Sequence, residues 1–302
     1  MTVADSDFTA QPGFLARIRK FSTSSGQAML ATTLVAIMLA LGAVSVAGYL
    51  SGHAVTSYDP IHMDIRARLQ PPSGTHWLGT DKIGRDLLAR VIAGAWISLS
   101  VSACVLAVAG TVGTIIGLVA GYFGGLVDEA LMRLTDLFLA FPALILAAAI
   151  AASFGGGMVP TTIALSAVFW PWYARLIRAR VLSLKQQDYV AAARAMGASN
   201  LRLIFVTLLP MVWPLVIVQA TTDVGFVILS ASGLSFLGLG AQSPTPEWGV
   251  MIFESLTNQP AAWWLVVFPG GAIALTAIGF NLLGDSLRDH LDPTLGAAEA
   301  GI

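Results

Sequence analysis

Six long apolar runs dominate the hydrophobic pattern of the chain, and most of the charged residues fall between them. An α-helix needs about 20 mainly apolar residues to cross the roughly 30 Å of hydrocarbon in a bilayer, and each run reaches that length. We therefore predict six transmembrane helices, at residues 28–50, 93–120, 132–153, 159–178, 207–238 and 262–286. The second and fifth runs exceed the length that a bilayer requires, so these helices can tilt or break at a glycine.

The composition supports an all-α polytopic membrane protein. Of the 302 residues, 56% are hydrophobic and 11% are charged, whereas a soluble domain carries about 25% charged residues. The net charge of −1 gives no field that would attract nucleic acid, so no nucleic-acid partner is expected. The single cysteine, Cys104, excludes an intrachain disulfide framework and argues against a Cys/His zinc site, so no metal ligand is assigned.

The distribution of Arg and Lys predicts which helix ends face the cytoplasm. Cytoplasmic loops are enriched in these residues, and most of them here fall on one side of a six-helix arrangement. They are Arg17, Arg19, Lys20, Arg133, Arg175, Arg178, Arg180, Lys185, Arg194, Arg202 and Arg288. The opposite side carries five cations, all in the long first loop. The bias favours two cytoplasmic termini, and the first apolar run starts too late for a signal peptide, so we interpret it as a retained helix.

A polar, arginine-bearing helix is predicted between the fourth and fifth apolar runs, within residues 188–210. Its small residues leave one surface with little bulk, so that a groove of another protein can close around it. They are Ala191, Ala192, Ala193, Ala195 and Gly197, with Val190 at the same helical spacing. Glycine is favoured just past a helix end, and Ser199 or Asn200 can cap the next helix. The alternative is an amphipathic linker that lies on the membrane surface, anchored by its arginines.

The spacing in this segment resembles the EAA loop of bacterial ABC importer permeases. That pattern is Glu-Ala-Ala, three residues, Gly, nine residues, Ile, one residue, Leu-Pro. The matching positions are Ala192, Ala193, Gly197, Leu209 and Pro210, while Ala191 stands at the Glu position and Thr207 at the Ile position. The resemblance implies that the helix docks in a cleft of an ATPase subunit. The residues it assigns to this coupling are Asp188, Ala191, Ala192, Ala193, Arg194, Gly197, Ala198, Leu209 and Pro210, with Asp188 as a substitute for the missing Glu.

Three further segments narrow the resemblance to the C-type subunits of dipeptide, oligopeptide and nickel permeases. Residues 76–86, HWLGTDKIGRD, are similar to the HxLGTDxxGRD signature of these subunits. Residues 234–249 match LSFLGLG followed by the P.P.WG pattern, and residues 280–293 match FNLLGDxLRDxLDP. At Ala231 the chain lacks a Glu that these subunits often carry just before LSFLGLG.

These motifs also have a structural interpretation. Glycines at turns and locally paired charges would pack the first outer loop onto the helices, at Gly79, Thr80, Asp81, Gly84, Arg85 and Asp86. Asn281 and Asp285 lie one helical turn apart and could cap a helix or pair with Arg288. We expect these residues to be mostly structural rather than to contact a substrate.

The resemblance implies the fold of a type I ABC importer permease and a set of partners. The chain would form a heterodimer with a homologous permease subunit, bind two ABC ATPase subunits or one fused pair, and receive peptide from an extracytoplasmic binding protein. It would lie in the lipid of the bacterial plasma (inner) membrane. The sequence contains no GxxxxGK[ST] phosphate loop. No cofactor is therefore expected in this chain, and ATP and Mg would be bound by the partner ATPase subunits.

On this interpretation the chain divides into two cytoplasmic tails, a first helix, an outer loop and a permease core. The tails are residues 1–27 and 287–302, the first helix 28–50, the loop 51–92 and the core 93–286. Within residues 239–261 we expect a short amphipathic segment, with Trp248 among its apolar residues and Glu247 and Glu254 on its polar face.

Polar residues within the apolar runs are candidates for the transport path. A carboxylate deep in a transmembrane helix costs about 2.5–3.5 kcal/mol on insertion scales, so it needs a reason. Gln219 and Asp223 lie four residues apart, on one face of the fifth predicted helix, and could line a polar pathway or bond a neighbouring helix. Asp136 could lie at the membrane interface, and the aromatic residues at 170–173 are typical of an interfacial belt with a proline kink.

Other functions remain open. A nickel-chelate importer is possible within the same family. A self-sufficient secondary transporter would need coupling carboxylates and preferably an internal repeat. Asp223 is the one deep carboxylate in the predicted helices, and no convincing repeat is present. A membrane-embedded enzyme is disfavoured because HExxH is absent and no Ser/His/Asp set converges. We expect an ABC importer permease for di- or oligopeptides that is not itself an enzyme.

Overall fold

The computed structural model describes residues 25–52, 55–256 and 261–291, and this part of the chain is helical without a β-strand. The long helices are α2 (Gly26–Ser51), α3 (Leu87–Phe123), α4 (Gly125–Leu139), α5 (Ala143–Ser153), α6 (Met158–Leu184), α9 (Leu209–Phe236) and α11 (Trp264–Leu291). The short elements are η1 (Ile65–Ala67), α7 (Asp188–Ala195), α8 (Asn200–Arg202), the π-helix η2 (Leu203–Leu208) and α10 (Trp248–Ser255). The all-α polytopic fold class predicted from the sequence is confirmed.

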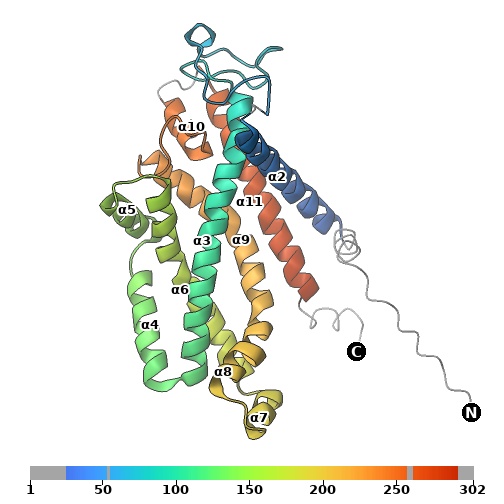
Figure 1. The fold of residues 1–302 in the computed structure, drawn as a ribbon, viewed down its shortest axis with the longest axis vertical. Coiled ribbons are helices and arrows are strands. Elements are labelled where there is room, and N and C mark those ends of the chain that lie inside the picture. Colours follow the sequence, from blue (N-terminus) through green and yellow to red (C-terminus); the bar gives the residue numbers. More distant parts are fainter. Residues whose placement is uncertain (1–24, 53–54, 257–260, 292–302) are drawn as a thin grey trace, which may run out of the picture.

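The long helices form one elongated bundle with different elements at its two ends (Figure 1). The helices α7 and α8 project from one end, which we call the α7 end. The segment 55–86 and α10 cover the opposite end, which we call the α10 end. The start of α2 and the end of α11 both point toward the α7 end.

Four helical segments are long and apolar enough to cross a membrane: α2, α3, residues 200–236 and α11. A bent pair, α4 with α5, provides a fifth candidate. The helix α6 covers the fourth predicted run and continues to Leu184, but its C-terminal half carries three arginines and is correspondingly polar. A count of six therefore depends on taking α4–α5 as one crossing and α6 as another.

The third predicted helix, 132–153, is not one continuous helix. The chain bends by 87° between α4 and α5. Pro142 stands at the N-cap of α5, and a proline disfavours helical backbone at the residue before it and gives no amide hydrogen for a helical bond. An apolar run of the right length does not reveal such a bend.

The core of the bundle lies where α3 and α6 pack along each other. Gly113, Gly117 and Gly121 recur every four residues on the face of α3 that meets α6, so they share one side of the helix. At each of them an added Cβ would collide with backbone or Cβ atoms of α6. Small residues let two membrane helices approach closely, and this glycine row therefore sets the contact between α3 and α6.

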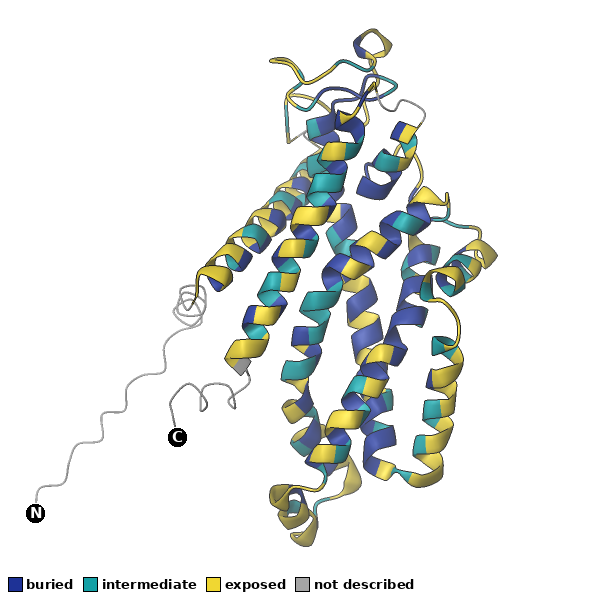
Figure 2. Ribbon diagram, turned by 180° about the vertical axis from the view of Figure 1, so that it is seen from behind, coloured by how far each residue is buried: buried dark blue, intermediate teal, exposed yellow. Residues whose placement is uncertain are grey.

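The outer helices of the bundle expose apolar side chains. Figure 2 shows exposed residues along α2 and α4, and buried residues concentrated on the central helices. Leu126 of α4 is 85% exposed and Ile145 of α5 is 66% exposed. Such surfaces suit lipid or another membrane subunit, because neither requires polar groups.

Candidate functional site

The polar helix predicted between the fourth and fifth runs is α7, at the tip of the α7 end (Figure 1). Asp188 lies in its first turn, where a carboxylate is favoured by the helix dipole. Gly197 follows the C-cap residue Met196 and has φ +86°. The Gly197 amide donates to the Arg194 carbonyl (3.0 Å), and the Ala198 amide donates to the Ala193 carbonyl (3.1 Å). Glycine adopts this left-handed backbone without steric cost, so it ends the helix sharply.

One face of α7 holds the helix to the bundle and the other is free within this chain. Val190 is 1% exposed and belongs to the hydrophobic core, with Ala193 and Ala198 packed beside it. The outward face carries side chains no larger than a methyl group, next to one carboxylate: Ala191, Ala192, Ala195 and Asp188 are all exposed. Asp188 precedes Ala191 and Ala192 by three and four residues, so it shares their face. The small-residue surface expected from the sequence thus faces outward, whereas Val190 and Ala193 do not belong to it.

The C-terminal end of α3 ties both flanks of α7 to the bundle. The Tyr122 hydroxyl donates to Asn200 Oδ1 over 2.7 Å. The Arg194 guanidinium lies 5.7 Å from the centroid of the Tyr122 ring, within the range of a cation–π interaction. On the other flank, Lys185 Nζ donates to the Gly121 carbonyl over 2.8 Å. A displacement of α7 would therefore act directly on α3.

After a turn at residues 196–199, a continuous helical path runs from α8 through η2 into α9 and so links α7 to α9. The Ser199 side chain accepts from the Arg202 amide at 3.4 Å and caps α8. The π-helix η2 follows, and the Leu209 amide donates to the Ile204 carbonyl. Leu209 is half-buried against the core, while Pro210 is exposed. Pro210 has no amide hydrogen to donate, and the wider π turn lies directly before it. Single π turns inside helices are frequent at functional sites.

Ion pairs join α4 and α6 near the α7 end. Arg178 donates through Nε and Nη2 to the two carboxylate oxygens of Asp128 at 2.5 and 2.6 Å. Arg175 donates to Asp136 at 2.6 Å, and both of these side chains are about half exposed. The Asp136 carboxylate thus has a cationic partner on a neighbouring helix.

Gln219 and Asp223 lie together on α9 and meet a tyrosine of α6. Gln219 Nε2 donates to Asp223 Oδ1 at 2.9 Å. The Tyr173 hydroxyl donates to Asp223 Oδ2 at 2.8 Å. Tyr173 is fully buried, which corrects its interpretation as part of an interfacial belt, and Trp170 is 7% exposed. Trp172 alone of these aromatic residues points outward, at 59% exposed.

Residues 79–86 form a largely buried group of polar side chains at the α10 end, which we call the polar cluster. The Thr80 hydroxyl donates to the Ala67 carbonyl, and Asp86 caps α3 by accepting from the Ala89 amide at 2.8 Å. Asp86 also pairs with His76 Nδ1 at 2.9 Å. Gly79 and Gly84 both have φ +82°, and an added Cβ at either would collide with backbone of the same outer segment. The motif therefore holds the outer segment and the start of α3 together.

The polar cluster extends to α10 through two buried arginines. Arg85 pairs with Asp81 of the motif and donates to Glu254 Oε2 at 2.6 Å. Arg90 donates to the same Glu254 oxygen at 3.3 Å. Arg85 and Arg90 are 0% and 1% exposed. The sequence placed Glu254 on the polar face of an amphipathic segment, and that interpretation is wrong because its carboxylate instead pairs with two buried cations, which Asp81 also contacts.

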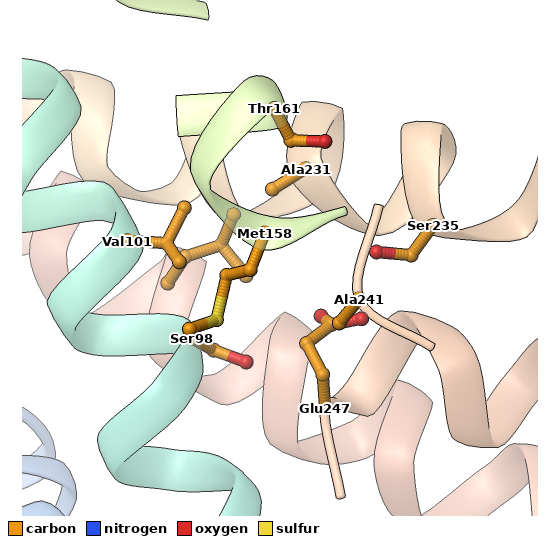
Figure 3. A pocket seen from close by; sticks show the side chains of 9 residues that line it. Ser98, Val101, Met158, Thr161, Ala231, Ser235, Ala241 and Glu247 are labelled. Atoms are coloured by element: carbon orange, nitrogen blue, oxygen red, sulfur yellow. The ribbon is translucent and has the colours of Figure 1, made fainter. Parts of the chain in front are cut away.

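Glu247 is likewise buried. Its carboxylate accepts from the Val250 amide at 3.0 Å and so caps α10. Figure 3 shows it beside Ser98 and Ala241, at a water-sized cavity between α3, α6, α9 and α10. The neighbouring Trp248 donates through Nε1 to the Val91 carbonyl at 2.9 Å. The periodicity of the segment did not predict this burial, because a capping role depends on where the helix starts.

Asn281 and Asp285 lie on the exposed surface of α11. Asn281 Nδ2 donates to the Ala277 carbonyl of the preceding turn at 2.9 Å. Asp285 is exposed, and within this described helix it forms no ion pair with Arg288. The pairing considered from the sequence is therefore absent, and neither residue reaches the Asp223 group.

These features define a class of protein: a multi-pass helical membrane protein with a small polar helix exposed at one end and a covered opposite end. Residues 113–296 match the family described as binding-protein-dependent transport system inner membrane component. The chain is 42% identical over 275 residues to the probable D,D-dipeptide transport system permease protein DdpC of Escherichia coli, covering 91% of each chain.

Two further similar proteins are also named as permeases of transport systems. The dipeptide transport system permease protein DppC of Alkalihalophilus pseudofirmus is 46% identical over 228 residues, which is 76% of this chain and 75% of the relative. The nickel transport system permease protein NikC of Escherichia coli is 44% identical over 242 residues, 79% of this chain and 86% of the relative. The chain therefore belongs to the family of inner-membrane permeases of ABC importers, in its dipeptide and nickel branch. A self-sufficient secondary transporter and a membrane-embedded enzyme are set aside.

Proposed function

We propose that this chain is the permease subunit of an importer that moves di- or oligopeptides into the cytoplasm, driven by separate ATPase subunits that dock on α7. The permease would pair with a homologous permease subunit. Two ABC ATPase subunits, or one fused pair, would bind ATP and Mg, for which this chain has no phosphate loop. A binding protein would deliver peptide from outside.

The observation that best supports this proposal is the outward face of α7. Three exposed alanines and Asp188 form a surface with little side-chain bulk, which a cleft can enclose closely. The opposite face is anchored by Val190, so a force on α7 is passed to the bundle instead of detaching the helix. Asp188 supplies a carboxylate one turn from Ala191, where the family pattern has glutamate.

Two connections would transmit closure of the ATPases to the membrane helices. One is the contact of Tyr122 with Asn200 and Arg194, which pulls on α3. The other is the path through α8 and η2 into α9, the helix that carries Asp223. Because α3 and α9 are long and continuous, a small rotation at the α7 end would be carried to the α10 end.

In this proposal the α7 end and both termini are cytoplasmic, and the binding protein docks at the α10 end. The cations of α6 and the α7 segment support that orientation. The polar cluster, through the ion pairs of Arg85 and Arg90 with Glu254, would hold the outer segment rigid for such docking.

Peptides are favoured as cargo because several of the similar permeases are named for dipeptides or di- and tripeptides. A nickel chelate is the second candidate, since the nickel permease is similar over most of both chains.

Purification of the tagged chain, co-expressed with its own partner subunits, tests the docking surface. Gly197→Arg should reduce recovery of the ATPases or their coupled activity, but it also strains a backbone with φ +86°. Ala192→Arg is the cleaner variant, because arginine is well tolerated in a helix and the residue is exposed. Glu129→Arg, at an exposed polar residue of α4, is the control.

We expect Ala192→Arg to lower ATPase recovery or peptide-stimulated ATP hydrolysis at least about tenfold, and Glu129→Arg to leave both near the wild-type value. If the wild-type chain recovers no ATPase, the importer proposal fails. If Ala192→Arg stays coupled, the importer remains and the role given to α7 is removed.

A further inference from the structure

A cavity of about 480 Å³ opens between α6 and α9, away from the docking helix. Its lining combines aromatic rings with a carboxylate: Phe169, Trp172, Arg175, Gln219, Asp223 and Phe226 all border it. Trp172 and Phe226 are 59% and 57% exposed, so the cavity is open at the surface of this chain.

The Asp223 carboxyl group accepts hydrogen bonds but has no cation beside it among the described residues. Each of its oxygens accepts one hydrogen bond, from Tyr173 and from Gln219. An ionised carboxylate has about four acceptor positions, so it can take further donors. Among the described residues it forms no ion pair, and Tyr173 is the titratable side chain that contacts it. Arg175, the cation that borders the cavity, is paired with Asp136 instead.

The position of Asp223 within the membrane limits which environments its carboxylate can face. The residue lies halfway along α9 and so near the middle of a membrane crossing. A carboxylate facing lipid there would be costly, and ionisable residues in membranes normally face a bundle interior or a water-filled path. The open side of this cavity therefore faces the transport path or a neighbouring subunit, not lipid.

We infer that this cavity binds the protonated amino group of the transported peptide, with Asp223 as its counter-ion. The free acceptor positions of the carboxylate match an ammonium group, which has three donors. The aromatic rim can add cation–π attraction for the same group. Tyr173 and Gln219 orient the carboxylate, and are positioning residues. The inference rests on the proposed function, because it requires peptide to pass this chain.

The test is the pH dependence of peptide uptake by the complete complex in proteoliposomes, comparing wild type with Asp223→Asn. The uptake rate of a simple free-amine dipeptide is measured at subsaturating concentration between pH 6.5 and 9. The quantity of interest is the ratio of the wild-type rate to the variant rate, since any pH effect on the binding protein cancels in it. Peptide amino groups lose their proton around pH 8, as α-amino groups do.

We expect a ratio of about tenfold or more at pH 6.5, the loss typical of removing a hydrogen bond to a charged group, falling below about threefold at pH 9. A ratio that is constant would overturn the inference: a constant value near one would show that Asp223 does not contribute to uptake, and a constant value well above one would indicate a permanent cation of the partner subunit. A ratio that rises with pH would overturn it as well, because ionisation of Asp223 would then govern uptake.

Two further variants serve as checks on the comparison of wild type with Asp223→Asn. Asp223→Ser also removes the charge and makes the same prediction, so the result does not depend on how one variant folds. Thr221→Val, on the same helix, replaces a hydroxyl whose one hydrogen bond within the described part of the chain is to the Ile217 carbonyl at 2.8 Å, and it should keep a ratio near one. Absence of ATP-dependent peptide uptake by the wild-type complex would overturn the proposed function itself, whereas normal wild-type uptake with a constant ratio overturns only the role of Asp223.

Discussion

Arg85 and Arg90 bring two guanidinium groups into the interior of the α10 end, and Glu254 is shared between them. Removing one partner of a buried ionic group is costly, because the remaining charge stays buried without compensation. We expect Glu254→Ala to lower the free energy of unfolding by about 3–5 kcal/mol. The measurement is the thermal stability of the detergent-solubilised chain, followed by fluorescence-detected size-exclusion chromatography.

An exposed pair in the same chain provides the control. Glu129 and Arg133 lie 3.7 Å apart with side chains 62% and 77% exposed. Exposed helix pairs of this spacing typically contribute about 0.3–0.5 kcal/mol, so Glu129→Ala should leave the melting temperature nearly unchanged. Equal effects of the two substitutions would show that the buried cluster does not stabilise the fold.

Single residues show where the sequence was informative and where it was not. The position of Gly197 past a helix end followed from local backbone preference, which depends on a few neighbouring residues. The long-range partners of Glu254 and Asp223 come from distant parts of the chain, 169 residues away for the Arg85–Glu254 bond and 50 for the Tyr173–Asp223 bond. Such contacts depend on tertiary packing, and periodicity along one segment does not contain them.

At the scale of elements, the contact between α3 and α6 depends on the glycine row of α3. A Cβ at Gly117 would lie 2.6 Å from the Ala174 carbonyl oxygen and 2.9 Å from Ile177 Cβ, which is closer than atoms pack. We expect Gly117→Ala to force the two helices apart and to destabilise the chain by about 1–3 kcal/mol, as overpacking does. The measurement is the same thermal assay, with uptake of peptide as a second readout.

Gly270 of α11 is the matched control for this substitution. An added Cβ there meets nothing within 4 Å. Because alanine is favoured over glycine in a helix by about 0.5–1 kcal/mol, Gly270→Ala should be neutral or slightly stabilising. If Gly117→Ala were equally well tolerated, close packing of the glycine row would not be what sets the α3–α6 contact.

The elements themselves were predictable to different degrees. Apolar run length located α2, α3, α6, α9 and α11, since the requirement of spanning hydrocarbon fixes their minimum length. It did not reveal the bend between α4 and α5, although Pro142 marks its position. It also missed the glycine row, whose four-residue spacing in the sequence was the available signal.

At the scale of the whole molecule, the two ends of the bundle differ in what they are built to do. The α7 end presents an exposed helix held by a few contacts, while the α10 end is bound together by buried ion pairs and by the caps of α3 and α10. A surface that must move with a partner suits the first arrangement, and a rigid docking platform suits the second. This difference supports placing the energy source at the α7 end.

The orientation can be tested by labelling single cysteines with a membrane-impermeant maleimide. Cys104, the one native cysteine, is exposed and is first replaced by serine. Gly74→Cys reports on the outer segment, where an added Cβ meets nothing within 4 Å. Met196→Cys, at a residue 82% exposed, reports on the α7 end. Glu129→Cys is a second reporter at the α7 end, in case a bound ATPase covers Met196.

We expect Gly74→Cys to react in right-side-out membrane vesicles, and the two reporters at the α7 end to react only in inside-out vesicles. This follows from the cations of α6 and the α7 segment, which favour the cytoplasmic side. The Cys104→Ser parent should remain unlabelled in both preparations, and detergent should render all three reporters reactive. The reverse pattern would place α7 outside the cell, where ATP-driven coupling is impossible, and the proposed role of this helix would then be wrong.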